Sequence, residues 1–125
     1  MRKSTFILFL LLIPVLAKAQ GLLSFEKTKH NFKFMHQGDT VSHSFSFKNT
    51  GDKPVTIKEA KFECACTSVI YPDEPVMPGE TASILVKFDS KDAIDRQERE
   101  VLILSDAKNA EVILVFKAIV LKKKK

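Results

Sequence analysis

Apolar and polar side chains alternate most regularly between residues 41 and 48. Val41, His43, Phe45 and Phe47 occupy every second position, and three serines and a lysine fill the others. Because successive side chains of a strand point to opposite faces, this period of two predicts a strand with one buried face. His43 is then expected at the edge of the core, since it shares a face with the two phenylalanines.

The same period of two recurs in the second half of the chain. Residues 81–89 place four apolar side chains on one face, and residues 111–121 place five on one face. Both segments are predicted to be strands. A turn at residues 106–110 indicates that the last strand closes a hairpin.

Less regular segments complete the pattern. Residues 22–34, 55–60 and 62–71 are rich in β-forming residues and are predicted to be strands. Residues 91–100 are mostly charged and predict a loop or one helical turn. Residues 101–104 form a continuous apolar run, which we expect to be buried on both faces.

The spacing of these segments predicts the fold class. About seven strands follow one another at intervals of roughly 8 to 15 residues, and no segment has a sustained helical period. Asn, Gly and Pro residues, which favour turns, separate several of the segments. We therefore predict an all-β fold, an immunoglobulin-like antiparallel β-sandwich.

The start of the chain has the composition of an export signal. Arg2 and Lys3 precede an apolar run that ends in the triplet Ala17-Lys18-Ala19. This is the order of a secretory signal peptide, and its uncharged part is shorter than the roughly 20 residues of a membrane-spanning helix. We expect a periplasmic or secreted protein with a signal peptide at residues 1–19, a sandwich domain at residues 20–121 and a lysine tail at residues 122–125.

The net charge of +5 comes from the two ends of the chain. Three of the 20 basic residues lie before residue 20 and four are Lys122, Lys123, Lys124 and Lys125, so residues 20–121 hold 13 basic and 15 acidic side chains. This balance argues against a nucleic-acid-binding face, which needs a basic surface. The tail is expected to be a solvated chain end, with weak contact to an anionic membrane surface as the alternative.

Cys64 and Cys66 are separated by a single residue. In an extended strand their Cα atoms would lie about 6.5 Å apart, so a disulfide between them needs a kink or a bulge. Export would bring both thiols into an oxidising environment. Four interpretations stay open: a local disulfide, two passive thiols, ligands for copper or zinc, and a working redox couple.

Residues 72–80 form a proline-rich connection that is expected to be stiff and exposed. Together with an exposed sheet edge, which accepts added strands, this loop is a candidate partner surface. Its candidate residues are Pro72, Pro75, Pro78, Gly79 and Glu80. No other motif indicates a reaction, since a nucleophile elbow and a calcium-loop spacing are both missing. We therefore expect neither an enzyme nor a bound metal or cofactor.

Four short motifs occur in a characteristic order. They are FSFKNTG at residues 45–51, CACT at residues 64–67, PGE at residues 78–80 and VKFD at residues 86–89. With these motifs, residues 24–120 resemble the bacterial domain-of-unknown-function 1573 family. The resemblance implies an exported immunoglobulin-like domain, related to sandwiches of the Hydin and major-sperm-protein type and common in Bacteroidota, with no established reaction.

The chain departs from the pattern of that family at two positions. Lys33 and Ala65 stand where the family usually has glycine. If those glycines have positive φ angles, the local turns here are expected to differ. The resemblance and the residues together predict an exported, non-enzymatic binding or scaffolding module of the bacterial envelope that binds another envelope protein. The alternative is a thiol-based copper-binding or redox site at Cys64 and Cys66.

Overall fold

The computed structural model describes residues 20–123, and the expected signal peptide and the last two lysines lie outside this range. Within it the chain forms eight strands. In chain order these are β1 (Leu23–Phe25), β2 (Lys29–His36), β3 (Thr40–Asn49), β4 (Ile57–Lys61), β5 (Thr67–Ile70), β6 (Thr81–Asp89), β7 (Asp95–Ser105) and β8 (Glu111–Leu121). Nothing in residues 20–123 forms a helix that could cross a membrane.

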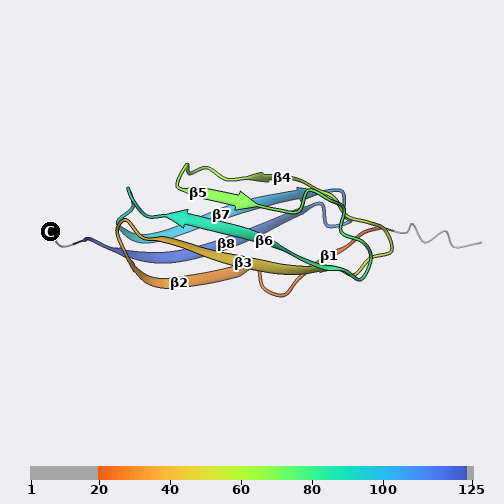
Figure 1. The fold of residues 1–125 in the computed structure, drawn as a ribbon, viewed down its shortest axis with the longest axis horizontal. Helices are drawn as coiled ribbons and strands as arrows, with labels where there is room; N and C mark the ends of the chain where they lie inside the picture. Colours follow the sequence, from red (N-terminus) through yellow and green to blue (C-terminus); the bar gives the residue numbers. More distant parts are fainter. Residues whose placement is uncertain (1–19, 124–125) are drawn as a thin grey trace, which may run out of the picture.

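The strands form two four-stranded sheets that pack face to face (Figure 1). Sheet A has the order β1-β3-β6-β5, and sheet B has the order β2-β8-β7-β4. The predicted all-β sandwich is therefore confirmed, with eight strands rather than about seven. One pair departs from the antiparallel expectation, because β2 runs parallel to β8.

The predicted first strand at residues 22–34 is wrong in one respect, since it is two strands in different sheets. β1 pairs with the end of β3 in sheet A, and β2 pairs with β8 in sheet B. Residues 26–28 carry the chain from one sheet to the other. β1 and β2 therefore both lie on one side of the sandwich, whereas β4 and β5 lie on the opposite side.

The core lies between the sheets and is built from the alternating positions that the sequence predicted. β3 and β6 are paired along nearly their whole length, which places Phe45 opposite Ile84 and Val41 opposite Phe88. The largest fully buried side chains include Phe45, Phe47, Phe88 and Phe116. Burying four phenylalanines supplies a large part of the apolar area that stabilises a domain of this size.

The prediction of a loop at residues 91–100 is wrong from Asp95 onward. Residues 95–100 form the first half of β7 and pair with residues 115–120 of β8. Their alternation is concealed because the inward-facing positions carry polar residues, Gln97 and Arg99, which are only half-buried. The apolar run at residues 101–104 is also not buried on both faces, since Val101 and Ile103 are buried and the two leucines are half-buried.

Lys33, where the family resemblance implies a glycine, has an unusual backbone conformation. Lys33 has a φ of 64°, in the left-handed region that favours glycine. It lies in an irregularity of the β2–β8 pairing between Asn31 and Phe34, and its amide donates to Asn31 Oδ1 at 2.8 Å. The left-handed backbone that glycine favours is therefore present at Lys33. At Ala65 the backbone has no positive φ.

Candidate functional site

β4 ends at Lys61, and the chain then leaves sheet B through a tight turn. The backbone amide of Thr67 donates to the carbonyl of Cys64 at 3.1 Å, and the amide of Cys66 donates to Cys64 Sγ at 3.2 Å. A disulfide joins Cys64 and Cys66, whose Cα atoms are 5.1 Å apart. The prediction that both cysteines lie on a strand is wrong, since β5 begins only at Thr67.

The disulfide changes the chemistry that this turn can perform. Copper and zinc bind thiolates, and the described part of the chain holds no free cysteine. Among residues 20–123, no group of three or more His, Cys, Asp or Glu side chains is placed to hold a metal ion. The bridge between two neighbouring cysteines is therefore no evidence for a copper site, and its geometric role is to fix the turn that diverts the chain into sheet A.

The early end of β4 leaves half of β7 without a neighbour on one side. β4 covers only the second half of β7, from Leu102 to Ser105. In the described structure, residues 95–100 pair with β8 on one side and with no strand on the other. Because the backbone groups of a strand point alternately to its two sides, about half of those in this segment face an open edge.

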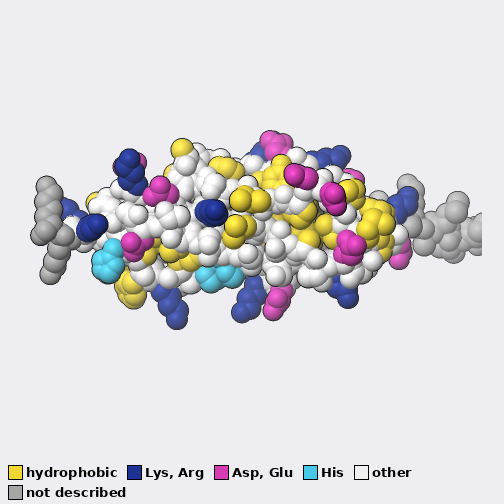
Figure 2. Space-filling model, viewed as in Figure 1, with side chains coloured by type: hydrophobic (Ala, Val, Ile, Leu, Met, Phe, Trp, Pro, Cys, Tyr) yellow, Lys and Arg dark blue, Asp and Glu magenta, His cyan; other side chains and the backbone are white. Residues whose placement is uncertain are grey.

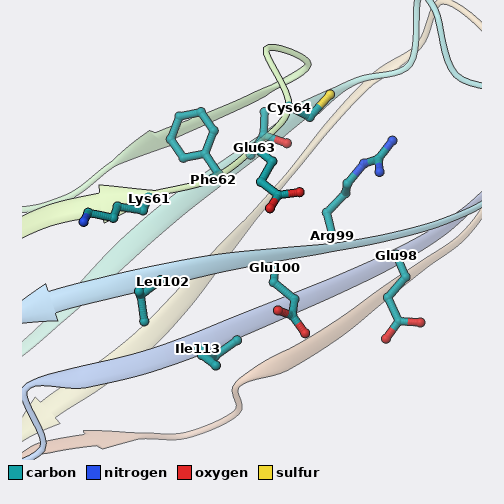
Figure 3. A pocket seen from close by; sticks show the side chains of 10 residues that line it. Lys61, Phe62, Glu63, Cys64, Glu98, Arg99, Glu100, Leu102 and Ile113 are labelled. Carbon is teal, nitrogen blue, oxygen red and sulfur yellow. The ribbon is translucent and has the colours of Figure 1, made fainter.

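A groove of about 950 Å³ surrounds this open edge (Figure 3). Its walls come from the turn after β4 and from β7, and its floor includes side chains of the outer face of sheet B. The groove is lined by Lys61, Phe62, Glu63, Cys64, Thr67, Glu98, Arg99, Glu100, Leu102 and Ile113. Phe62 and Ile113 are exposed, so the groove combines apolar surface with charged groups.

The charged side chains of the groove lie on different sides of β7. Glu98 and Glu100 extend with Leu102 along the outer face of sheet B, whereas Arg99 extends to the other side, toward the turn that carries Cys64 (Figure 3). Glu63 extends into the groove from that turn. Arg99 Nη2 donates to Gln97 Oε1 at 2.7 Å, but Arg99 Nε is buried and has no hydrogen-bond partner among the described residues.

The proline-rich loop lies at the other end of β5 and does not contribute to the groove. It is fastened to the rest of the sandwich, since Val55 and Val76 exchange two backbone hydrogen bonds and the Gly79 amide donates to the carbonyl of Asn49 at 2.8 Å. Pro75, Pro78, Gly79 and Glu80 remain exposed, whereas Pro72 is half-buried. The two predicted partner surfaces are therefore separate.

Asn49 holds the proline-rich loop from inside the protein. Its side chain is fully buried, and Nδ2 donates to the carbonyls of Lys53 and Val76 at 2.7 and 2.9 Å. Its Oδ1 accepts hydrogen bonds from the amides of Leu22 and Gly51 at 3.2 and 3.0 Å. The asparagine of the FSFKNTG motif is therefore a structural residue that joins three segments of the chain.

His43 lies at the edge of the core, as predicted, but its partner was not predicted. His30 of β2 stacks on it with ring centroids 3.6 Å apart and an angle of 7° between the rings. Figure 2 shows histidine side chains where β2 and β3 adjoin. Burial lowers the pKa of both rings, His43 lowers that of His30 further, and Lys27 contributes to both. Within residues 20–123 no third metal-ligating side chain is placed beside this pair, and the stacked rings form a contact between the two sheets.

Gln97 and Arg99 were not predicted as site residues, because the charged segment 91–100 resembles a loop in the sequence. One signal could have found them: a final strand of 11 residues in a hairpin needs a partner of similar length. Counting back from the turn at residues 106–110 would have extended the preceding strand to residue 95.

Of the lysine tail, Lys122 and Lys123 are exposed, and the other two lysines are outside the described range.

Solved structures with a similar fold come from several kinds of protein. A protein of unknown function from Porphyromonas gingivalis W83 has a TM-score of 0.73 at 15% identity, over 86% of this chain and 50% of that one. The ASH/PapD-like domain 7 of human CEP192 has a TM-score of 0.65 at 8% identity, over 99% of each chain. The VesB protease of Vibrio cholerae has a TM-score of 0.61 at 18% identity, over 78% of this chain and 31% of that one.

At such identities these likenesses show the fold alone, and this chain spans about half the length of the P. gingivalis protein. No curated protein matches the chain by sequence. The profile of a family described as a protein of unknown function, DUF1573, matches residues 23–120. This range contains nearly all of both sheets, the disulfide turn and the groove, so the chain belongs to the DUF1573 family.

Proposed function

We propose that this protein is an exported, non-enzymatic binding module of the bacterial envelope that holds another envelope protein at the open edge of β7. The observation that carries the proposal is the departure of the chain from sheet B after Lys61. It leaves residues 95–100 without a neighbouring strand, beside a groove of about 950 Å³. An extended segment of a partner can add to such an edge through main-chain hydrogen bonds and gain affinity from side chains in the groove.

The other edges of the sandwich are less suited to an added strand. β1 and β5 are short, with three and four residues. β2 is longer, but the irregularity between Asn31 and Phe34 interrupts it, and bulges of this kind are a device by which proteins prevent pairing at an edge. β1 pairs only with Phe47–Asn49 of β3, so the rest of β3 is also an open edge. The edge of β7 is regular from Arg96 to Glu100, after Asp95 with its φ of 69°, and the groove of about 950 Å³ is lined by β7 and not by β3, which favours the edge of β7 as the binding surface.

Export is the second part of the proposal and is supported by the composition of residues 1–19. A disulfide such as that between Cys64 and Cys66 persists in oxidising compartments, which is consistent with a periplasmic location. Intact-mass analysis of the protein from an envelope fraction is expected to give a mature chain that starts near Gln20. A chain that retains Met1 would contradict this part of the proposal.

Site-specific photocrosslinking in the producing cells tests the binding surface. A photoreactive amino acid at Glu98 is expected to form an adduct with one envelope protein. The same amino acid at Ser83, an exposed position on β6 of sheet A, is the matched control and is expected to form none. Equal adducts from both positions, or none from Glu98, would count against β7 as the binding edge.

A further inference from the structure

Arg99 occupies an inward-facing position of β7, where a charged side chain is unusual. It lies opposite Phe116, which is fully buried, and between the exposed Glu98 and Glu100, whose side chains point outward. Arginine is rarely buried without a partner, because removing its charge from water costs free energy that only hydrogen bonds and opposite charges recover. Arg99 is half-buried, so a carboxylate that paired with it would recover free energy that its partial removal from water costs.

The described residues provide only part of that compensation. A guanidinium group has five N–H donors, and it binds a carboxylate best with two parallel hydrogen bonds. Gln97 Oε1 accepts one hydrogen bond from Nη2, and it is a neutral acceptor. Arg99 Nε is buried without any partner in residues 20–123. A buried donor of this kind can be satisfied by a water molecule or by an acceptor from outside the chain.

The open edge places such a group at a defined position. In the register of β4, Lys61 lies opposite Leu102 and Ala60 lies opposite Ile103. A segment that continued this antiparallel register would place its third residue beyond the Lys61 position opposite Arg99, with a side chain that points inward. Its neighbours on either side would lie opposite Glu98 and Glu100, with side chains on the outer face.

We propose that the partner contributes an extended segment with a carboxylate at this central position, which pairs with Arg99, and basic residues on both sides of it, which pair with Glu98 and Glu100. This inference rests on the proposed function and adds the chemistry of the partner to it. The segment thus has the alternation basic, acidic, basic. Glu63 extends into the same groove from the turn after β4, where its carboxylate competes with that of the partner for Arg99.

Selection from a display library of random peptides on the purified exported protein tests this inference. The selected peptides are expected to share the basic-acidic-basic order and to slow amide hydrogen exchange at residues 95–100. Replacing the central acid by its amide is expected to weaken binding at least about tenfold. Arg99→Gln is expected to cause a similar loss, and Arg99→Lys is expected to restore part of it because the positive charge returns.

Two matched variants separate the role of Arg99 from general effects. Arg96→Gln removes an arginine from the same strand at an exposed position and is expected to change the dissociation constant less than about threefold. Glu63→Gln is expected to strengthen binding of the acidic peptide, because a competitor for Arg99 is removed. Urea unfolding of each variant shows whether the domain remains folded, so a loss of binding with unchanged stability is assigned to the site.

The contradicting results distinguish the two proposals. Peptides that protect residues 95–100 but bind Arg99→Gln as well as the wild type would overturn the inference about the carboxylate and leave β7 as the binding edge. A library that yields no peptide protecting β7 would contradict both. A concentration-dependent dimer with the same protected residues would identify the occupant as a second copy of this chain and overturn the inference of a separate partner.

Discussion

Replacing Asn49 by alanine removes the side chain that joins three segments: Leu22 just before β1, the turn after β3 and the proline-rich loop. Four hydrogen bonds of 2.7 to 3.2 Å are lost. A typical hydrogen bond contributes a net of about 1 kcal/mol, with a range of about 0.5 to 1.5. The variant is therefore expected to lose about 4 kcal/mol of the free energy of unfolding, within a range of about 2 to 6 kcal/mol.

Burial decides where in this range the loss falls. Asn49 is fully buried, so water cannot easily replace its side chain at the carbonyl of Val76, where the hydrogen bond is buried. The amides of Leu22 and Gly51 are only partly buried and can recover some hydrogen bonding with water. A loss near the middle of the range follows, which is a large share of the stability of a small domain.

Urea unfolding followed by circular dichroism measures this loss, provided that the dependence of stability on urea is unchanged. Asn31→Ala is the matched control, because Asn31 is exposed and accepts one hydrogen bond, from the amide of Lys33. It is expected to lose less than about 1 kcal/mol. A loss below about 1 kcal/mol for Asn49→Ala, or one no larger than the control, would refute the role assigned to Asn49.

Three further predictions concern the core, the histidine pair and the bulge in β2. Phe88→Ala is expected to lose about 3 to 5 kcal/mol in urea unfolding, and the exposed Phe34→Ala at most about 0.5 kcal/mol; similar losses would contradict the assigned faces. Because burial lowers the pKa of His30 and His43, the unfolded chain binds more protons than the folded protein just below the ordinary histidine pKa of about 6.5. Stability is therefore expected to be fully present above that pH and to fall as the pH decreases through the lowered values, and a double phenylalanine variant that keeps the same pH slope would contradict this origin. Lys33→Gly relieves a left-handed backbone and is expected to raise the free energy of unfolding by up to about 1 kcal/mol, seen as a higher melting temperature. A lower melting temperature would contradict the assigned strain at Lys33.

The regular strands could be predicted because local pattern and tertiary burial agree in them. β6 has apolar side chains at every inward position, β3 has them at all but His43 and Asn49, and the structure pairs the two strands along nearly their full length. The first half of β7 could not be recognised in this way. Its inward positions carry Gln97 and Arg99, which resemble a solvated loop in the sequence, and its strand conformation depends on pairing with β8.

Contacts between distant segments were also beyond the sequence. His30 and His43 belong to different sheets, and only the crossing of the chain from β1 to β2 brings them together. The cysteine pair shows the opposite case. Its spacing limited the geometry to a kink or to separate thiols, but the position of the turn at the end of β4, and the open edge that results, depend on where β4 stops pairing.

Amide-resolved hydrogen exchange across β7 tests the central claim most directly. In the protein alone, amides of residues 102–105 lie between β4 and β8 and are expected to exchange slowly, whereas those amides of residues 95–100 that face away from β8 are expected to exchange fast. The partner identified by crosslinking from Glu98 is expected to slow exchange at these same edge amides and to leave β5 unchanged. Exchange at residues 95–100 that is already slow in the free protein, or that the partner does not alter, would contradict the claim that the open edge of β7 is the binding surface.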